Sequence, residues 1–389
     1  MDLRLTPHQA DLKRRARALT DEVMAYELQC EEENGLPPDV LQRLYGRVKE
    51  HGFQAYNMPV EWGGGGFSRV EITLALEEFG RLTNGLWWLM VPPANALRAC
   101  TPAQRERYLF PCIRGERFTA VAVTEPGAGS DPRMIQATAE RTTSGWVLNG
   151  EKWFVSAGDR ADFIIVQAKV MPGEHHTLFL VDKGTPGVAV KRVPKFMQNF
   201  VFEHPEFTFT NVELPVDAVL GDVGGGFTLS KNWFLAARLL IGAQTVGAAM
   251  RALEIATAWA KERRTFGRRL IEHQMIATML VDSVIEINQA RALVYRVAWE
   301  ADNGMDAKSL MAKGAMIKVA SSECAGRVVD RCLQVLGGRG YMRENPVERL
   351  YRDMRIERIW EGSSEIQRLI LTNELDKRGL TNLFELPGS

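Results

Sequence analysis

A carboxylate in the segment Trp360-Glu361-Gly362-Ser363 stands where a general base could act. Glu361 lies in a short glycine-containing loop, directly before a helix that is predicted to begin at a serine. A carboxylate held between a tryptophan and a glycine can be partly removed from water, which raises its pKa and makes it a better proton acceptor. Taken alone, the Ser-x-Glu pattern after the glycine is also typical of ordinary helix capping.

A second segment, residues 123–131 (VTEPGAGSD), follows a short apolar run that is typical of a strand. Such a loop exposes backbone N–H groups and hydroxyls at a strand end, where they could hydrogen-bond the ring edge of a planar cofactor. The segment is not a phosphate loop, because a third glycine and a Gly-Lys-Ser/Thr are both missing. A plain turn is the alternative interpretation.

The elements that must position these residues change along the chain. Thr6, Ser68 and Thr101 are each predicted to cap a helix within the first 115 residues. From about Phe118 to Gly221 the hydrophobic period becomes alternating, which predicts a compact antiparallel β-domain.

Within this β-domain, residues 146–155 are expected to form two strands around an Asn149-Gly150 hairpin turn. Further strands are expected at residues 163–167, 177–181, 188–193 and 207–212.

Three long apolar runs after residue 226 predict helices at 227–264, 274–303 and 307–336. Helices that are apolar on more than one face need partners on several sides, so we expect a bundle that also packs against other subunits. The domain boundaries that follow from these patterns are 1–117, 118–222 and 223–389.

Composition restricts the classes of function. Lys+Arg and Asp+Glu both number 48, so no net charge attracts nucleic acid or an anionic membrane surface. The five cysteines include no C-x-x-C pair, which indicates unpaired thiols in a reducing compartment. With no signal peptide or membrane-spanning apolar run in view, we expect a soluble, cytoplasmic protein. The pair His175-His176 has no third ligand nearby, so no metal site is expected.

With these segments together, the chain resembles the acyl-CoA dehydrogenase family from about Leu5 to about Asn373. Residues 123–131 resemble the first signature of that family. Residues 334–341 (QVLGGRGY), followed by 361–363 (EGS), resemble the second, and 263–267 (RRTFG) with 272–274 (EHQ) resemble a third motif. The resemblance implies an α+β multi-domain fold: an N-terminal helical domain, a central antiparallel β-domain and a C-terminal four-helix-type bundle, assembled as a homotetramer.

The activity implied by the resemblance is an FAD-dependent oxidoreductase that desaturates an acyl-CoA thioester between Cα and Cβ. Glu361 would remove the α-proton while the flavin accepts the β-hydride. Some relatives carry the base on the long helix instead, directly before an arginine. Here that position is Ala237, before Arg238, and alanine cannot serve, so the assignment falls on Glu361 alone.

The resemblance also assigns binding residues. Those implied for FAD are Val123, Thr124, Ser130, Phe154, Ser156, Arg263, Thr265, Phe266, Gln274, Gln334, Gly337, Gly338, Ser363 and Glu365. Ser130, Arg238 and Gly362 match positions that contact the acyl-CoA substrate. Without the family, Phe154 could be a strand core residue, Arg263 could complement a helix C-terminus, and Gly337-Gly338 could be a helix cap.

The partner implied as electron acceptor is a soluble electron-transfer flavoprotein. An acyl-CoA oxidase and a dehydrogenase of carrier-protein thioesters are alternatives within the same fold, whereas flavin monooxygenases need no carboxylate base. A non-catalytic scaffold without flavin is an alternative of a different class. The acyl group is not set by the motifs, but Trp87 and Trp88, with Trp360 before the base, could shorten the acyl pocket unless they simply pack in the core.

Overall fold

The N-terminal helices begin at the capping residues that the sequence indicates. The computed structural model describes residues 4–173 and 175–387, apart from the side chains of residues 231–235. It contains complete capping boxes at Thr6, Ser68 and Thr101, which confirms these three predicted helix starts. The helices before the sheet are α1 (Pro7–Met24), α2 (Glu27–Glu33), α3 (Pro38–Glu50), α4 (Arg69–Phe79), α5 (Pro102–Gln104) and α6 (Phe110–Arg114), with the short helices η1 (Val60–Trp62), η2 (Leu86–Met90), η3 (Asn95–Ala99) and η4 (Arg105–Leu109) among them.

Eight strands of the described chain form one sheet, whose order is β6-β7-β3-β2-β4-β5-β8, with β1 also paired to β4. The strands are β1 (Thr119–Ala122), β2 (Thr138–Arg141), β3 (Gly145–Lys152), β4 (Phe163–Met171), β5 (His175–Asp182), β6 (Val188–Arg192), β7 (Glu206–Pro215) and β8 (Val219–Leu220). The sheet is mostly antiparallel, as expected, but β1 and β2 both run parallel to β4. These parallel pairs arise because long connections, not hairpins, join β1 and β2 to β4.

The predicted hairpin turn at Asn149-Gly150 is wrong. Both residues lie inside the single strand β3, which pairs with β7 on either side of them. Leu148 pairs with Val212 and Gly150 with Phe209, so Asn149 of β3 faces two residues of β7, which form a bulge on β7 where Asn211 has a φ of 48°. Ladder pairing on both sides of the bulge, which is long-range, outweighs the local turn preference.

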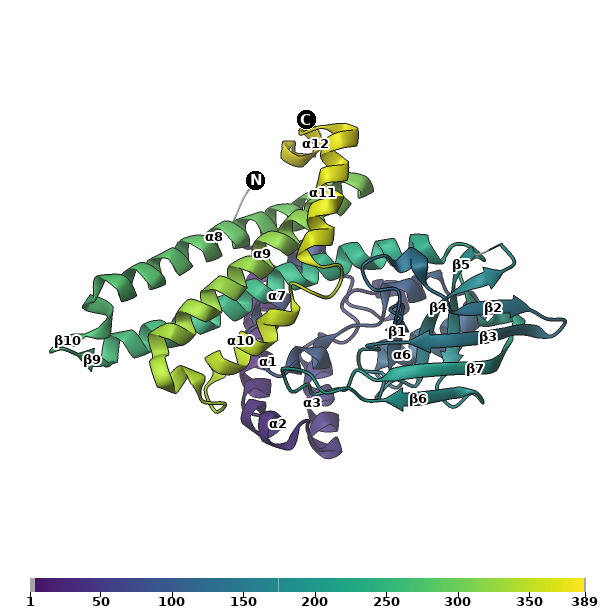
Figure 1. Ribbon diagram of the computed structural model, residues 1–389, viewed down its shortest axis with the longest axis horizontal. Helices are drawn as coiled ribbons and strands as arrows, with labels where there is room; N and C mark the ends of the chain where they lie inside the picture. Colours follow the sequence, from purple (N-terminus) through teal and green to yellow (C-terminus); the bar gives the residue numbers. More distant parts are fainter. Residues whose placement is uncertain (1–3, 174, 388–389) are drawn as a thin grey trace.

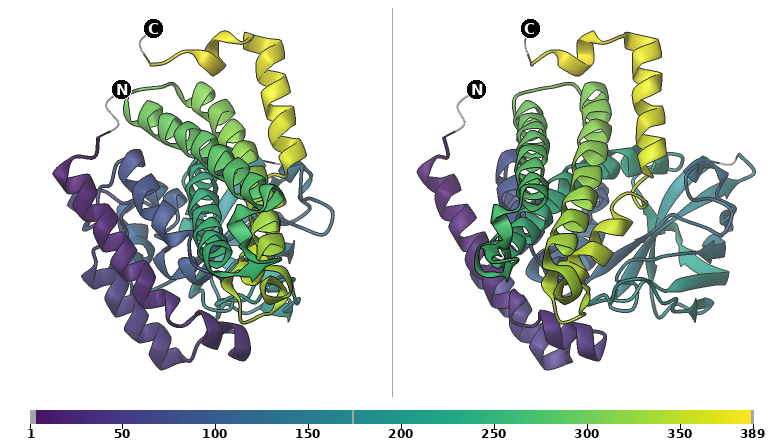
Figure 2. Two further views of the ribbon diagram at one scale, coloured as in Figure 1. Left: turned by 90° about the vertical axis from the view of Figure 1, so that its left-hand side faces the viewer. Right: turned by 60° about the vertical axis from the view of Figure 1, so that its left-hand side comes forward.

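The C-terminal helices match the three predicted long helices to within two residues. They are α7 (Gly226–Glu262), α8 (Gln274–Asp302), α9 (Ala307–Leu336), α10 (Pro346–Ile356), α11 (Ser364–Arg378) and α12 (Thr381–Phe384), with the small hairpin β9 (Arg264–Thr265) and β10 (Arg268–Arg269), η7 (Leu270–Glu272) and η8 (Gly337–Tyr341) between them. Helix α7 runs from the sheet to the β9–β10 hairpin at the opposite end of the bundle (Figure 1). The bundle lies between α1 and the sheet in the right-hand view of Figure 2.

Helix α7 is the central element of the bundle. The sequence analysis expected no membrane-spanning apolar run, but residues Ala236–Glu262 are long and apolar enough to span a membrane. Of their most apolar window, 72% is buried inside the molecule, as is usual for a core helix. Gly80 and Gly247 let α4 and α7 touch, because a Cβ at either position would collide with backbone of the other helix. The architecture is the implied one: N-terminal helices, a central sheet and a C-terminal helical bundle.

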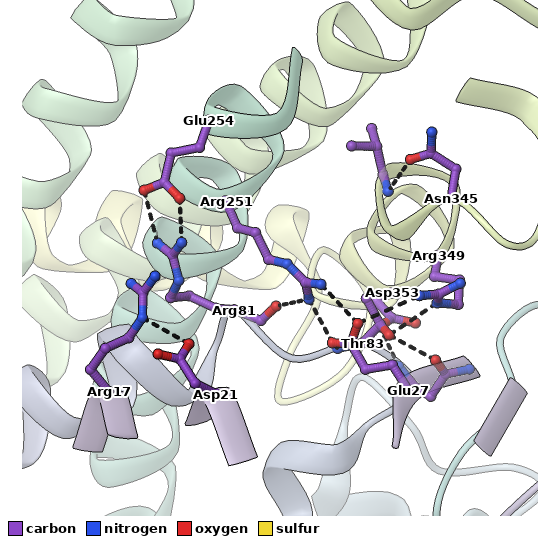
Figure 3. A network of polar contacts seen from close by, with 12 residues as sticks. Arg17, Asp21, Glu27, Arg81, Thr83, Arg251, Glu254, Asn345, Arg349 and Asp353 are labelled. Carbon is purple, nitrogen blue, oxygen red and sulfur yellow. Dashed lines mark hydrogen bonds and ion pairs between the residues drawn. The ribbon is translucent and has the colours of Figure 1, made fainter. Parts of the chain in front are cut away.

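A buried ionic network ties the N-terminal helices to the helix that leads to Glu361 (Figure 3). Glu27 of α2 accepts from Arg251 of α7 at 2.8 Å and lies 3.5 Å from Arg349 of α10. Asp353, also on α10, accepts the backbone N–H of Asn84 at 2.8 Å. Helix α10 is therefore fixed from two sides before the chain reaches the candidate base.

Candidate active site

Glu361 lies in the connection between α10 and α11, and its backbone is strained. Its φ is 55°, a left-handed conformation that side chains other than glycine seldom adopt, and Gly362 follows with a φ of 83°. Ser363 then caps α11 through its hydroxyl, which accepts the N–H of Ile366 at 3.5 Å. The predicted helix start at a serine shortly after Glu361 is confirmed.

Two buried side chains hold this loop by its carbonyl groups. Lys318 Nζ of α9 donates to Gly362 O at 2.7 Å. Gln367 Nε2 of α11 donates to Glu361 O at 3.0 Å and to Gly362 O at 2.9 Å. Both side chains are fully buried, so these bonds are shielded from water. Neither residue was among the sequence-based candidates, although Lys318 is a single charge within an apolar stretch of α9 and could have been noticed for that reason.

Burial and two cations set the proton affinity of Glu361. Its Oε2 is buried and has no hydrogen-bond partner among the described residues. Burial raises the pKa of Glu361 to about 7, while the charges of Arg238 and Lys318 oppose that rise. Burial likewise lowers the pKa of Arg238 to about 10 and that of Lys318 to about 8, so both cations remain mainly protonated at neutral pH. A carboxylate whose pKa is close to 7 can accept a proton and release it again near neutral pH.

Three tryptophans, Trp87, Trp88 and Trp360, lie together and are called the tryptophan cluster below; Trp360 directly precedes Glu361 in the chain. Trp87 and Trp88 are stacked with ring centroids 4.8 Å apart. Trp360 meets them edge-on, at 6.2 Å from Trp87 and 6.5 Å from Trp88. Trp360 Nε1 donates to the buried Glu357 Oε2 at 2.7 Å. All three indoles are half-buried, so each still has accessible surface.

The loop 123–131 is held in shape by a buried ion pair. Lys152 Nζ lies 2.7 Å from Glu125 Oε1 and donates to Val123 O at 2.9 Å. Burial lowers the pKa of Lys152 to about 8, and the adjacent Glu125 carboxylate favours its charged form. Trp153 N donates to Thr124 O at 2.8 Å. The loop is therefore joined to the residues that follow β3, which bring Phe154 and Ser156 next to it.

Phe154 is not a strand core residue. It follows β3 with a φ of 56° and leaves 45% of its surface exposed, with Phe196 edge-on at 6.1 Å. Thr124 and Ser156 are half-buried, and Ser130 is exposed. An accessible ring on a strained backbone, together with nearby hydroxyls, suits one face and edge of a planar ring system. We call these residues, with Val123, the proximal set.

The other cofactor candidates form a distal set at the far end of the bundle. Arg263 stands at the C-cap of α7, as the plain helix-end interpretation expects, but its guanidinium lies 5.9 Å from the Trp259 ring, and Arg339 of η8 lies 5.4 Å from the same ring. Trp259, Leu336 and Arg339 help to line an open cavity of about 440 Å³ there. The members of the distal set are Arg263, Thr265, Phe266, Gln274, Gln334, Gly337 and Gly338.

The structure thus divides the predicted site into separate parts. Glu361, Gly362 and Arg238 are brought together, with Ser363 and Glu365 at the start of α11 beside them. The proximal set lies on the sheet and the distal set at the opposite end of α7 (Figure 1). Among the described residues, no group of three or more His, Cys, Asp or Glu side chains could hold a metal ion.

Comparison with known proteins matches all three parts of the chain. Models of the N-terminal, middle and C-terminal domains of acyl-CoA dehydrogenases match residues 6–116, 120–212 and 224–375. The acryloyl-CoA reductase (NADH) of Anaerotignum propionicum is 33% identical over 388 residues, which cover 97% of each chain.

Two solved structures have the same fold. Butyryl-CoA dehydrogenase from Megasphaera elsdenii is 29% identical with a TM-score of 0.89, and the match covers 97% of this chain and 100% of that one. The FAD complex of PigA is 27% identical with a TM-score of 0.90 and the same coverage.

Proposed function

Because this chain belongs to the acyl-CoA dehydrogenase family, we propose that Glu361 is the base that removes the α-proton when the enzyme desaturates an acyl-CoA thioester between Cα and Cβ. The observation that carries the assignment is the buried, unpartnered Oε2 of Glu361 on a strained loop that Lys318 and Gln367 hold. A buried oxygen without a partner is costly, and a carboxylate in that state gains by taking a proton.

The two cations near Glu361 act on its ionisation in this proposal. Arg238 and Lys318 keep part of the Glu361 population ionised despite burial, so that a proton acceptor is present at neutral pH. The backbone N–H of Glu361 is expected to donate to the thioester oxygen as negative charge develops there. One well-placed donor of this kind lowers a barrier by about 3 kcal/mol. Ser130, Arg238 and Gly362 would contact the CoA thioester.

FAD, when bound, supplies the acceptor for the hydride that leaves Cβ. The proximal set fits its ring system, because Phe154 offers an accessible face and Thr124, Ser130 and Ser156 offer hydroxyls. The distal set fits the diphosphate and adenine, because Arg263 presents a planar fork of donors beside an open cavity. Ser363 and Glu365 would complete the adenosine contacts.

We further propose a soluble, cytoplasmic enzyme that passes its electrons to an electron-transfer flavoprotein. The relatives include a reductase as well as a dehydrogenase, so the direction in which the thioester reacts needs its own measurement. Reduction by thioester under anaerobic conditions, followed by reoxidation with either electron-transfer flavoprotein or dioxygen, separates a dehydrogenase from an oxidase.

The first experiment is a visible absorption spectrum of the purified protein, followed by anaerobic titration with saturated acyl-CoA thioesters. A bound flavin that bleaches on titration supports the proposal. A colourless protein that FAD cannot reconstitute would favour a scaffold without catalytic activity.

A further inference from the structure

The geometry of the tryptophan cluster bears on which acyl group the site takes, and the argument rests on the function proposed above. Trp360 directly precedes the base, so its indole lies within a side chain's reach of the carboxylate that must meet Cα. The Trp360 ring is inclined by 81° to Trp87 and by 68° to Trp88, whereas Trp87 and Trp88 lie nearly parallel at 24°. The three rings therefore make a corner, with a flat double wall on one side and a ring edge on the other.

The cluster keeps accessible aromatic surface in a place where burial would be favoured. Each indole is only half-buried, although a tryptophan can bury 150–250 Å² of mainly apolar surface. A ligand that covers the apolar surface left open on these rings would gain free energy in proportion to the area that it buries. Trp87 and Trp88 pack against the buried helical core, yet each retains some accessible surface.

The Trp360 indole is fixed in orientation by a hydrogen bond, whereas the buried Nε1 of Trp88 has no hydrogen-bond partner among the described residues. Trp360 Nε1 donates to Glu357 Oε2 at 2.7 Å, and Glu357 is buried. On the other side, His204 lies 6.2 Å from Trp88 and 4.2 Å from Phe200. Burial lowers the pKa of His204 to about 4, so its ring is neutral and continues the aromatic wall.

We propose that the tryptophan cluster is the specificity-determining wall of the acyl site and that it selects a compact acyl group bearing an aromatic ring near Cβ. A flat ring can lie on one indole face while its edge meets another, the two arrangements that aromatic pairs prefer. A long unbranched chain has no such complementarity and meets the double wall of Trp87 and Trp88 instead. Glu357 is a positioning residue for this wall, because it holds the Trp360 indole.

The test compares kcat/KM for three probes in the FAD-loaded enzyme: butanoyl-CoA, 3-phenylpropanoyl-CoA and hexadecanoyl-CoA. We expect 3-phenylpropanoyl-CoA to exceed each of the other two by about tenfold or more, since pocket shape commonly discriminates by such factors. Trp88→Ala should reverse the order by lowering kcat/KM for the aryl probe and raising it for hexadecanoyl-CoA. Trp62→Ala, at a half-buried tryptophan outside the cluster, is the matched control and should leave the order unchanged.

Glu357 is tested by a pair of substitutions. Glu357→Leu should raise KM for 3-phenylpropanoyl-CoA more than KM for butanoyl-CoA, and Glu357→Gln, which keeps an acceptor for the indole N–H, should restore the aryl preference. Flavin content and melting temperature are measured for every variant. Where a variant does not fold, the wild-type probe series and Trp88→Phe carry the test.

The possible outcomes distinguish failure of the proposed function from failure of the proposed aryl preference. If none of the three thioesters reduces the flavin, the proposed function fails and this inference fails with it. If the flavin is reduced but kcat/KM rises steadily to hexadecanoyl-CoA, with the aryl probe no better than butanoyl-CoA, the inference alone is overturned and the site takes long straight chains.

Discussion

At the scale of single residues, burial and nearby charges have opposite effects on the pKa of Glu361. Glu361 has a pKa of about 7, well above the ordinary value of 4.5, because burial disfavours its ionised form. Between these two pKa values the folded protein binds more protons at this site than the unfolded chain, so this group makes folding less favourable as the pH rises through that window. If Glu361 is the base, activity should have the opposite dependence on pH, because only an ionised carboxylate accepts the α-proton.

The pH profile gives a first prediction. The kcat/KM for thioester-dependent flavin reduction should rise with pH and reach half of its maximum near pH 7. Stopped-flow flavin bleaching from about pH 5 to pH 9 measures this dependence. A profile whose acidic limb lies near the ordinary carboxyl value of 4.5 would show that Glu361 is not the titrating base.

Lys318 allows a sharper prediction about the same group. Lys318→Met removes a cation that opposes the rise in the Glu361 pKa and breaks the bond to Gly362 O, so the acidic limb should move upward by about one pH unit. Lys261→Met, at an exposed lysine of α7, is the control and should leave the limb in place. An unchanged profile with a lower rate would mean that Lys318 acts only on the shape of the loop.

At the scale of elements, the sequence was informative wherever local patterns decide structure. Hydroxyl caps predicted the starts of α1, α4 and α5, and hydrophobic periodicity predicted α7, α8 and α9. Asn149-Gly150 could not be assigned in the same way, because β3 continues through it, paired with β7 on both sides. For the same reason Glu361 was recognisable from its neighbours in sequence, whereas Lys318, which reaches the loop from α9, was not.

The ionic network that positions α10 gives a prediction on stability. Arg251→Met should lower the free energy of unfolding by about 3 kcal/mol, because it leaves the buried Glu27 carboxylate short of a partner. Arg368→Met, which breaks a pair with Glu323 that is partly exposed, should cost less than about 1 kcal/mol. Denaturant unfolding of both variants measures these two changes in the free energy of unfolding. Equal changes would show that the buried network stabilises the fold no more than an exposed ion pair does.

At the scale of the whole molecule, the positions of the two cofactor sets point to an assembly. Helix α7 has 37 residues and is therefore about 55 Å long, with the proximal set near one end and the distal set at the other. One dinucleotide cannot cover that length, so we propose that the two sets serve one FAD only when they come from different subunits. Exposed apolar side chains in and next to the distal set, among them Phe266 at 97% and Tyr341 at 82%, are consistent with surfaces that a neighbouring subunit or cofactor covers.

A shared site couples cofactor binding to assembly. Arg263→Ala should weaken FAD retention and shift the protein toward smaller oligomers together, because a ligand that bridges subunits stabilises their association. Arg114→Ala, at an exposed pair with Glu116, is the control. Light scattering of both variants with and without added FAD measures the effect, and a wild-type monomer that retains its flavin would contradict the shared site.

The most direct test of the central assignment is Glu361→Gln, which keeps the shape of the side chain and removes the base. The variant should bind FAD with an unchanged spectrum and be at least as stable as wild type above pH 7, because the buried carboxylate is gone. Anaerobic flavin reduction by the best thioester should fall by about 10²–10⁴ or more, the usual cost of losing a general base. A reduction rate within about tenfold of wild type would contradict the account, because some other group would then be taking the α-proton.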